Sequence, residues 1–118
     1  MISGIQTFKY RRRRITVIFW NGKIWFNAYE IYEILGYKGS LIKLMHLVDA
    51  KDRFTKSNGR TSEGELRPSI RLISENGLYV YTYHKVLKPK QREKAQELFD
   101  FVQAEIVPIF DEYIRSWL

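Results

Sequence analysis

The chain has 118 residues and a mass of 14.2 kDa, enough for one compact domain with a single hydrophobic core. Cysteine is absent, which excludes disulfides, thiolate metal sites and a cysteine nucleophile. The longest stretch without a charged residue, residues 76–84, is far shorter than the ~20 residues of a membrane helix. Residues 1–10 also lack the apolar block of a secretory signal, so we expect a soluble, intracellular protein.

The net charge of +7 is divided unevenly along the chain. Residues 1–92 hold 18 Lys or Arg against 7 Asp or Glu, whereas residues 93–118 hold 2 against 6. A basic body with an acidic end favours an anionic partner, with nucleic acid ahead of an acidic protein or an anionic membrane surface. The composition is equally compatible with a domain that merely has a high isoelectric point, about 9.7.

The N-terminal third predicts strands and then a helix. Residues 5–10 alternate loosely, and residues 15–26 predict a β-hairpin, because Asn21-Gly22 tolerates the positive φ angles of a two-residue turn. Asn27 follows in the position of an N-cap, with Glu30 at the capping-box spacing, so that its side chain is expected to reach back. Gly36 supplies a left-handed stop, which predicts a helix over residues 28–35.

The middle of the chain predicts shorter elements. Ser40 has the position of an N-cap for a second helix that ends near Asp49, with apolar residues at helical spacing. Residues 55–68 are polar and predict either an exposed loop or a weak hairpin tip. Residues 69–73 predict a short strand, and Ser74 begins a helix that extends to about Tyr83.

Pro89 is well placed as the first residue of a long C-terminal helix. Its apolar stripe consists of Leu98, Phe99, Val102, Ile106, Ile109, Tyr113 and Trp117. Pro108 should kink or break this helix at about Val107. The expected fold class is therefore α+β, with a small N-terminal antiparallel sheet packed against four or five helices in a single domain, residues 1–118.

No pattern of residues indicates an enzyme, a metal site or a cofactor. His46 and His84 lie in separate segments without ligand spacing, and the acidic pairs fall on solvated helix faces. Neither a Gly-x-Ser-x-Gly nucleophile motif nor a glycine-rich phosphate loop is present.

Two basic clusters are candidates for phosphate binding. The first is a run of four guanidiniums, Arg11, Arg12, Arg13 and Arg14, whose side chains would alternate faces in an extended segment. Its alternative role is a charged edge that prevents aggregation between sheets. The second cluster lies at the entry to the last helix and consists of Lys85, Lys88, Lys90, Arg92 and Lys94. A helix N-terminus attracts phosphate, although a solvated face explains these cations equally well.

A third candidate is the pair of short helices joined by residues 36–39, which include Lys38. This spacing is typical of a helix-turn-helix, whose second helix enters the major groove. Ser40 and Lys43, with His46 beside them, would then point outward. A helical pair packed for structural reasons alone is the alternative.

The order of several segments resembles the Bro-N domain, which occurs at the N-terminus of phage antirepressors and of the Bro proteins of insect DNA viruses. The segments that carry this resemblance are residues 15–18, 22–28, 34–37, 73–79, 99–102 and 105–108. The resemblance implies a viral or prophage protein that binds DNA and regulates transcription or relieves repression, in the host cytoplasm or nucleus. Members commonly carry a second, C-terminal domain, so the chain is either a stand-alone version or a fragment.

The apolar motif positions are expected to build the core; they are Trp25, Phe26, Leu35, Leu78 and Tyr79. The run at residues 11–14 is not part of the family pattern, so its role rests on its chemistry alone.

These observations favour a domain that binds double-stranded DNA mainly through phosphates, without a membrane partner. The candidate DNA-binding residues are Arg11, Arg12, Arg13, Arg14, Lys38, Ser40, Lys43, Lys85, Lys88, Lys90 and Arg92. The alternative is a protein-interaction module that binds a repressor or host factor. The acidic last helix and its apolar end, with Ile114, Trp117 and Leu118, favour that role or a homodimer. Binding of RNA or a single strand, with tyrosines 79, 81 and 83 as stacking faces, is a further alternative.

Overall fold

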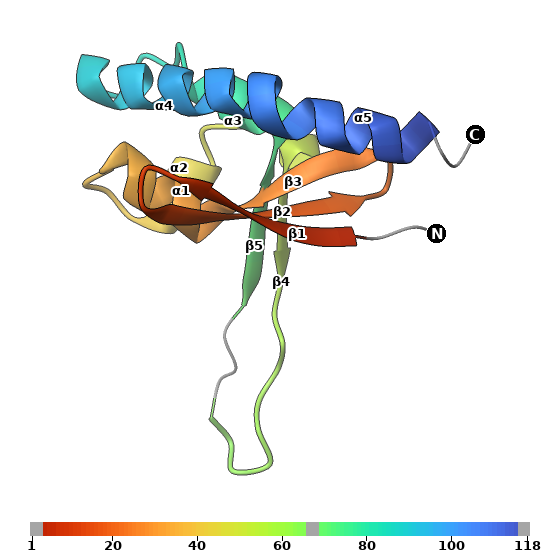
Figure 1. Ribbon diagram of the computed structural model, residues 1–118. Coiled ribbons are helices and arrows are strands. Elements are labelled where there is room, and N and C mark those ends of the chain that lie inside the picture. Colours follow the sequence, from red (N-terminus) through yellow and green to blue (C-terminus); the bar gives the residue numbers. More distant parts are fainter. Residues whose placement is uncertain (1–3, 66–68, 116–118) are drawn as a thin grey trace.

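The computed structural model describes residues 4–65 and 69–115, with the backbone alone described for residues 113–115. Within these residues five strands form one antiparallel sheet in the order β1-β2-β3-β5-β4, and the long C-terminal helix lies across one face of β1–β3 (Figure 1). The strands are β1 (Gly4–Tyr10), β2 (Arg13–Trp20), β3 (Lys23–Asn27), β4 (Arg53–Lys56) and β5 (Ile70–Ser74). The α+β fold class expected from the sequence is confirmed.

The hairpin predicted over residues 15–26 is confirmed in its register and in its turn. Strand β2 pairs with β3 from Val17↔Phe26 to Trp20↔Lys23, so Asn21 and Gly22 alone make the connection. Their φ angles are 55° and 73°, which is the left-handed geometry that a two-residue hairpin turn requires.

Helix α1 (Ala28–Leu35) begins and ends where its capping residues predict. The Asn27 side-chain oxygen accepts hydrogen bonds from the Tyr29 and Glu30 amides at 2.9 and 3.2 Å. Gly36 then stops the helix with a φ of 64°. The buried face of α1, with Ala28, Ile31 and Leu35, packs into the core.

Helix α2 (Leu41–Met45) is capped by Ser40 as predicted, but it is one turn long and does not extend to Asp49. The next two amides, of Leu47 and Val48, bond three residues back, to Leu44 and Met45. This tighter winding ends the helix. A 3-10 turn (Ala50–Asp52) follows and connects directly to β4.

Of the polar segment 55–68, residues 55–56 belong to strand β4, which forms a hairpin with β5, and residues 57–60 and 62–65 are an exposed connection. Residues 66–68 lie outside the described residues. The register of β4 and β5 runs from Arg53↔Ile73 to Lys56↔Ile70, and the predicted strand over residues 69–73 is β5. Helix α3 (Glu75–Tyr81) follows directly, capped by Ser74 as expected, and ends two residues before Tyr83. Of the motif positions expected in the core, Tyr79 is the exception, because it is 47% exposed while Tyr81 is buried.

The C-terminal helix consists of α4 (Pro89–Phe101), a π-helical segment (Val102–Ile106) and α5 (Val107–Arg115). Pro89 is its first residue, as predicted. The helix does not break near Pro108 as the sequence allowed; it continues through a π-helical segment, in which the Val107 amide bonds the Val102 carbonyl five residues back. Proline lacks an amide hydrogen and its ring crowds the carbonyl four residues earlier, so the turn before Pro108 is wound more widely.

The π-helical segment changes which residues face the sheet. In a regular helix of 3.6 residues per turn, Ile109 would lie about three turns from Leu98 on the same face. One extra residue in the turn shifts this role to Phe110, which is buried with Leu98, Val102 and Ile106. The predicted stripe is therefore wrong at Ile109, which is 42% exposed. Phe99 is half-buried, and the Tyr113 and Trp117 side chains lie outside the described residues.

Candidate nucleic-acid interface

Three basic segments meet at one end of the molecule, which we call the basic end. It comprises the β1–β2 turn, the loop between α1 and α2, and the start of α4, and Figure 1 shows these segments gathered together. The Gln91 side-chain amide of α4 donates to the Gly36 carbonyl at the end of α1, at 3.3 Å. On the other side of α4, Glu97 contacts the β1–β2 turn through Arg11.

Arg11 and Arg12 form a tight turn rather than part of an extended segment, so the expectation that all four arginines alternate faces is wrong. Strand β1 pairs with β2 up to Tyr10↔Arg13, which leaves two residues for the connection. Both adopt positive φ angles, 48° for Arg11 and 69° for Arg12. Such angles suit Gly or Asn, and a longer side chain adopts them at an energetic cost. Sequence reasoning missed this turn because arginine is not a turn signal.

Two of the four guanidiniums have carboxylate partners. Arg11 Nη1 lies 2.5 Å from Glu97 Oε2, which raises the pKa of Arg11, and its guanidinium also lies over the Tyr10 ring. Arg14 Nε lies 3.4 Å from Glu30 Oε2. Among the described residues, Arg12 and Arg13 form no ion pair, and both are exposed. These two guanidiniums are therefore available to an anion from solution.

Glu30 does not complete a capping box as expected. Its carboxylate instead accepts hydrogen bonds from the Thr16 amide at 2.6 Å and the Thr16 hydroxyl at 3.1 Å, in addition to its pair with Arg14. This carboxylate joins the first turn of α1 to strand β2. It thereby fixes the position of Arg14 relative to the turn.

Cations of α4 and of the α1–α2 loop also lie at the basic end. Lys38, Lys88 and Lys90 are exposed. The Lys94 ammonium lies close to Gly36, since a Cβ atom placed on that glycine would be 3.7 Å from it. Arg92 is different, because it is half-buried and donates to the Leu87 carbonyl at 2.5 Å. Its guanidinium is thus partly occupied in holding the start of the helix.

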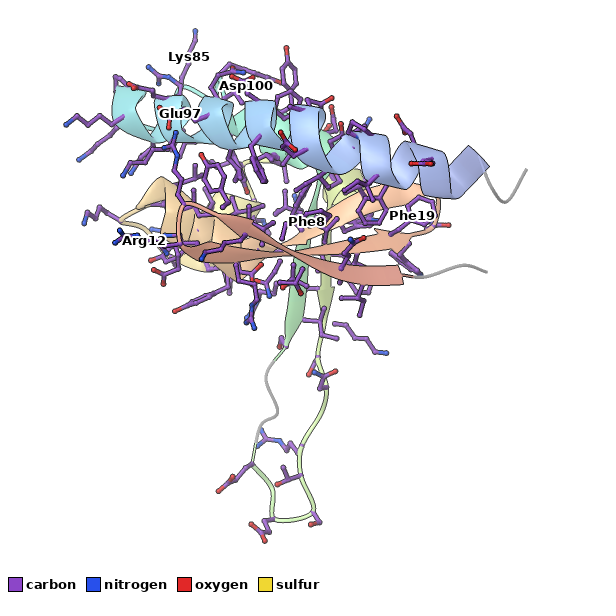
Figure 2. The ribbon with its side chains drawn as sticks, viewed as in Figure 1. Phe8, Arg12, Phe19, Lys85, Glu97 and Asp100 are labelled. Carbon is purple, nitrogen blue, oxygen red and sulfur yellow. The ribbon has the colours of Figure 1, made fainter. Side chains whose placement is uncertain are left out.

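Other predicted residues lie apart from this end or have structural contacts. Figure 2 shows Lys85 projecting away from the sheet, on the far side of α4. The Ser40 hydroxyl accepts from the Lys43 amide at 3.1 Å, so it serves as the helix cap. Lys43 is exposed on the single turn of α2. Sequence reasoning did not select Lys9, which is exposed and pairs with Arg14 across β1 and β2; strand periodicity could have found it.

Charge changes sign along the C-terminal helix. Beyond the basic first turns of α4, the exposed charged side chains described up to residue 112 are Asp100, Glu105, Asp111 and Glu112, and Asp100 is labelled in Figure 2. An anionic polymer is therefore attracted to one end of this helix and repelled along the rest.

A groove of about 670 Å³ lies near the opposite end of β2, beside the β2–β3 turn. Its apolar wall includes Phe19, Tyr79 and Phe99. Its charged lining is mixed, with Glu75 and Asp111 beside Lys23 and Lys51. Within the groove, buried Asp52 accepts from the Ser74 hydroxyl at 2.8 Å and from the Asn76 amide at 2.9 Å. Over the described part of the chain, no group of three or more His, Asp or Glu side chains is placed to hold a metal ion.

The family model described as the BRO family, N-terminal domain (Bro-N) matches residues 14–108. No curated protein and no solved structure matches the chain. None of the described helices combines the length and the apolar character that crossing a membrane requires.

Proposed function

This chain belongs to the BRO family, N-terminal domain, and we propose from this membership that it binds double-stranded DNA with its basic end, mainly through phosphates. The family association with phage antirepressors and insect-virus Bro proteins supports a role inside the host cell, in transcription regulation or relief of repression. The contacting groups that we propose are Arg11, Arg12, Arg13, Arg14, Lys38, Lys88 and Lys90. Lys43 and Lys85 lie outside this group and contribute less.

The observation that carries the proposal is the arginine pair at two strained turn positions. Asn-Gly makes the same kind of turn at residues 21–22 of this chain without strain. The turn geometry therefore does not require arginine at positions 11 and 12, and the exposed Arg11–Glu97 ion pair contributes little stability. Guanidiniums at an exposed turn do supply bidentate hydrogen-bond donors for phosphate oxygens.

The two ion pairs set the order in which the arginines act. Arg12 and Arg13 bind phosphates directly. Arg11 must first break its ion pair with Glu97, and Arg14 its ion pair with Glu30, before either binds a phosphate. The Arg11–Glu97 pair is the more exposed of the two, so it breaks more readily. Glu97 consequently competes with DNA for the turn, so Glu97→Gln should strengthen binding. Glu112→Gln is the matched control, because Glu112 lies roughly 22 Å further along the helix, beyond the screening length at physiological salt.

The test replaces Arg11-Arg12 by Asn-Gly and measures duplex DNA binding at several salt concentrations. The logarithm of affinity falls with the logarithm of salt by about 0.9 for each phosphate neutralised, so the variant should show a slope shallower by about 1 to 2 units. Lys51→Ala, which removes a cation beside the distant groove, should leave the slope unchanged. Because the new turn relieves strain, the variant should also melt at the same temperature as the wild type or higher. Wild-type affinity and slope in the variant would contradict the proposal.

A second candidate function is supported by the groove beside Asp52. Its aromatic wall and mixed-charge lining fit an apolar segment of a protein with polar residues at its edges, such as a segment of a repressor or host factor. Tyr79→Ala, at an exposed aromatic residue, should weaken such a complex and leave DNA binding unchanged. A homodimer stays a prediction, because the Ile114, Trp117 and Leu118 side chains on which it rests lie outside the described residues.

A further inference from the structure

Strand β1 is the outermost strand at one edge of the sheet (Figure 1). It pairs with β2 over all seven of its residues, one residue against one, so it has no bulge, and it contains no proline. Bulges, proline and short length are the devices by which proteins keep an edge strand from pairing with another chain. The strand at the other edge, β4, has only four residues. Within the described part of the chain, β1 is therefore the edge best suited to pairing.

The backbone groups that β1 leaves free can be assigned from a hydrogen bond of its neighbour. In an antiparallel pair, opposite residues alternate between hydrogen-bonded and non-hydrogen-bonded positions. Thr16 lies opposite Thr7, but its amide donates to the Glu30 carboxylate at 2.6 Å rather than toward β1. Thr7 and Thr16 are therefore a non-hydrogen-bonded pair, so the Thr7 amide and carbonyl point to the free edge. By the same alternation, those of Ile5 and Lys9 point there too.

These three positions are complementary to a second copy of themselves. An antiparallel copy of β1, related by a two-fold axis at Thr7, places Thr7 opposite Thr7 and Ile5 opposite Lys9. Each free amide of the three then meets a free carbonyl of the other copy. Lys9 does not meet its own equivalent, so no like charges are opposed in this register. The aliphatic stem of Lys9 instead covers Ile5 of the second copy, which is 71% exposed in the single chain.

Charge favours the same antiparallel arrangement. Helix α5 lies over the start of β1, because the ring of Phe110 lies 6.1 Å from that of Phe19, the residue opposite Gly4. Its exposed charged side chains, described up to residue 112, are Asp111 and Glu112. The basic β1–β2 turn lies at the other end of β1. Antiparallel pairing brings the basic turn of each copy toward the acidic end of the other, whereas parallel pairing would bring like ends together.

We propose that two copies of this chain associate through β1 and so join their five-stranded sheets into one continuous antiparallel sheet. The interface consists mainly of one strand from each copy, so it is smaller than that of a permanent dimer, and the association is reversible. The inference goes beyond the proposed function, because the pairing needs no DNA. It does not involve the side chains of residues 114, 117 and 118.

The pairing also sets the distance between the two basic ends. The centre of the Arg11-Arg12 turn lies about 4.5 residues from Thr7, which corresponds to about 15 Å of strand. The two turns are then about 30 Å apart, close to the length of one turn of B-DNA, about 34–36 Å. The two-fold axis is perpendicular to the sheet, so both turns can meet one duplex laid across it. If the proposed function holds, the dimer therefore fits two inverted half-sites one helical turn apart.

Thr7→Lys tests the pairing at its centre. Thr7 is exposed and its backbone groups do not bond β2, so a lysine leaves the fold intact, but in the dimer two lysines would face each other across the axis. Ser62→Lys is the matched control, because it adds the same charge at an exposed residue outside the sheet. Circular dichroism and the melting temperature verify that both variants fold.

Sedimentation equilibrium without DNA measures the association over about 10 μM to 1 mM protein. We expect the apparent mass of the wild type to rise from 14.2 kDa toward twice that value as the concentration increases. Ser62→Lys should behave in the same way. Thr7→Lys should associate at least about fivefold more weakly, because like charges are opposed at the centre of the interface.

A disulfide provides a second measurement that does not depend on charge. The wild type has no cysteine, so Thr7→Cys can form a disulfide only with another copy. Opposed Cα atoms in a hydrogen-bonded antiparallel pair lie about 5.5 Å apart, within the range of about 4.4–6.8 Å that a disulfide spans. Under mild oxidation we expect Thr7→Cys to form covalent dimers at least about tenfold faster than Ser62→Cys, because pairing raises the effective concentration of the thiols.

The inference is overturned if the wild type keeps the mass of a monomer up to about 1 mM, or if folded Thr7→Lys associates as tightly as the wild type. If Thr7→Lys does not fold, the two cysteine variants decide, and equal rates of crosslinking overturn the pairing. Failure of the wild type to bind duplex DNA would contradict the proposed function alone, because neither measurement contains DNA. A dimer that binds inverted half-sites equally well at one turn and at one and a half turns would overturn the predicted spacing alone.

Discussion

The winding of residues 102–106 decides which of two adjacent side chains stabilises the core, and this can be tested by mutation. Phe110 is 4% exposed, with its ring centroid 6.4 Å from that of Phe8 and 6.1 Å from that of Phe19. Ile109 is 42% exposed. A regular α-helix would turn Ile109 toward the sheet instead, so Phe110→Ala and Ile109→Ala report directly on the π-helical segment.

The expected magnitudes are well separated. Truncation of a buried phenylalanine to alanine costs about 3–5 kcal/mol of unfolding free energy, through lost transfer energy and the cavity that remains. Truncation of a fully buried isoleucine to alanine lowers the unfolding free energy by about 2–5 kcal/mol. Ile109 keeps nearly half of its surface in water, so Ile109→Ala should lower it by about 1 kcal/mol. Phe110→Ala should therefore cost at least about 2 kcal/mol more than Ile109→Ala.

Urea unfolding followed by tryptophan fluorescence measures both values, with Trp20 and Trp25 in the sheet as reporters. If Phe110→Ala does not fold, Phe110→Leu provides a smaller cavity and the same comparison. The reasoning is refuted if Ile109→Ala is as destabilising as the Phe110 variant. That result would mean that the helix continues without the extra residue.

Two further predictions concern single hydrogen bonds. Asn27→Ala should lower the free energy of unfolding by about 1 kcal/mol, because two amides of α1 lose their acceptor. Asn27→Ser should restore most of this loss, and equal melting temperatures for all three proteins would argue against the cap. Tyr81→Phe should cost about 1 kcal/mol near pH 8, because the Tyr81 hydroxyl donates to the Leu44 carbonyl at 2.7 Å. Burial raises the pKa of Tyr81 above its unfolded value of about 10, so its contribution is present below pH 10 and declines as pH rises further. Between pH 9 and pH 11 the wild type should therefore lose more stability than Tyr81→Phe, and parallel losses in urea titrations would count against this cause.

The local elements of this fold could be predicted from the sequence because their signals are local. Asn21-Gly22 carries its own turn geometry, and Asn27 and Gly36 limit α1 by hydrogen bonds and backbone angles within a few residues. The same holds for Ser74 and Pro89 at the starts of α3 and α4. Each of these features depends on neighbours along the chain, so one sequence contains the information.

The basic end was only partly predictable. Its cations could be listed from the sequence, but their contacts could not. Arg11 meets Glu97 only because α4 crosses the sheet, and Gln91 brings α4 to Gly36 across 55 residues of chain. The tight turn at Arg11-Arg12 was hidden because the register of β1 on β2, rather than turn propensity, imposes its positive φ angles.

The tertiary structure decided which residues of the C-terminal helix are buried and which strands pair. Helical spacing placed Ile109 in the core, and the widened turn before Pro108 gave that place to Phe110, which fills the space against Phe8 and Phe19. The sequence left the polar residues 55–68 open between a loop and a hairpin tip. The pairing of β5 with β3 on one side and with β4 on the other determines that β4 and β5 form a hairpin. Sequence determines what each segment can form from its own neighbours, whereas burial against distant segments selects among those forms, because the free energy of packing exceeds the small differences in local preference.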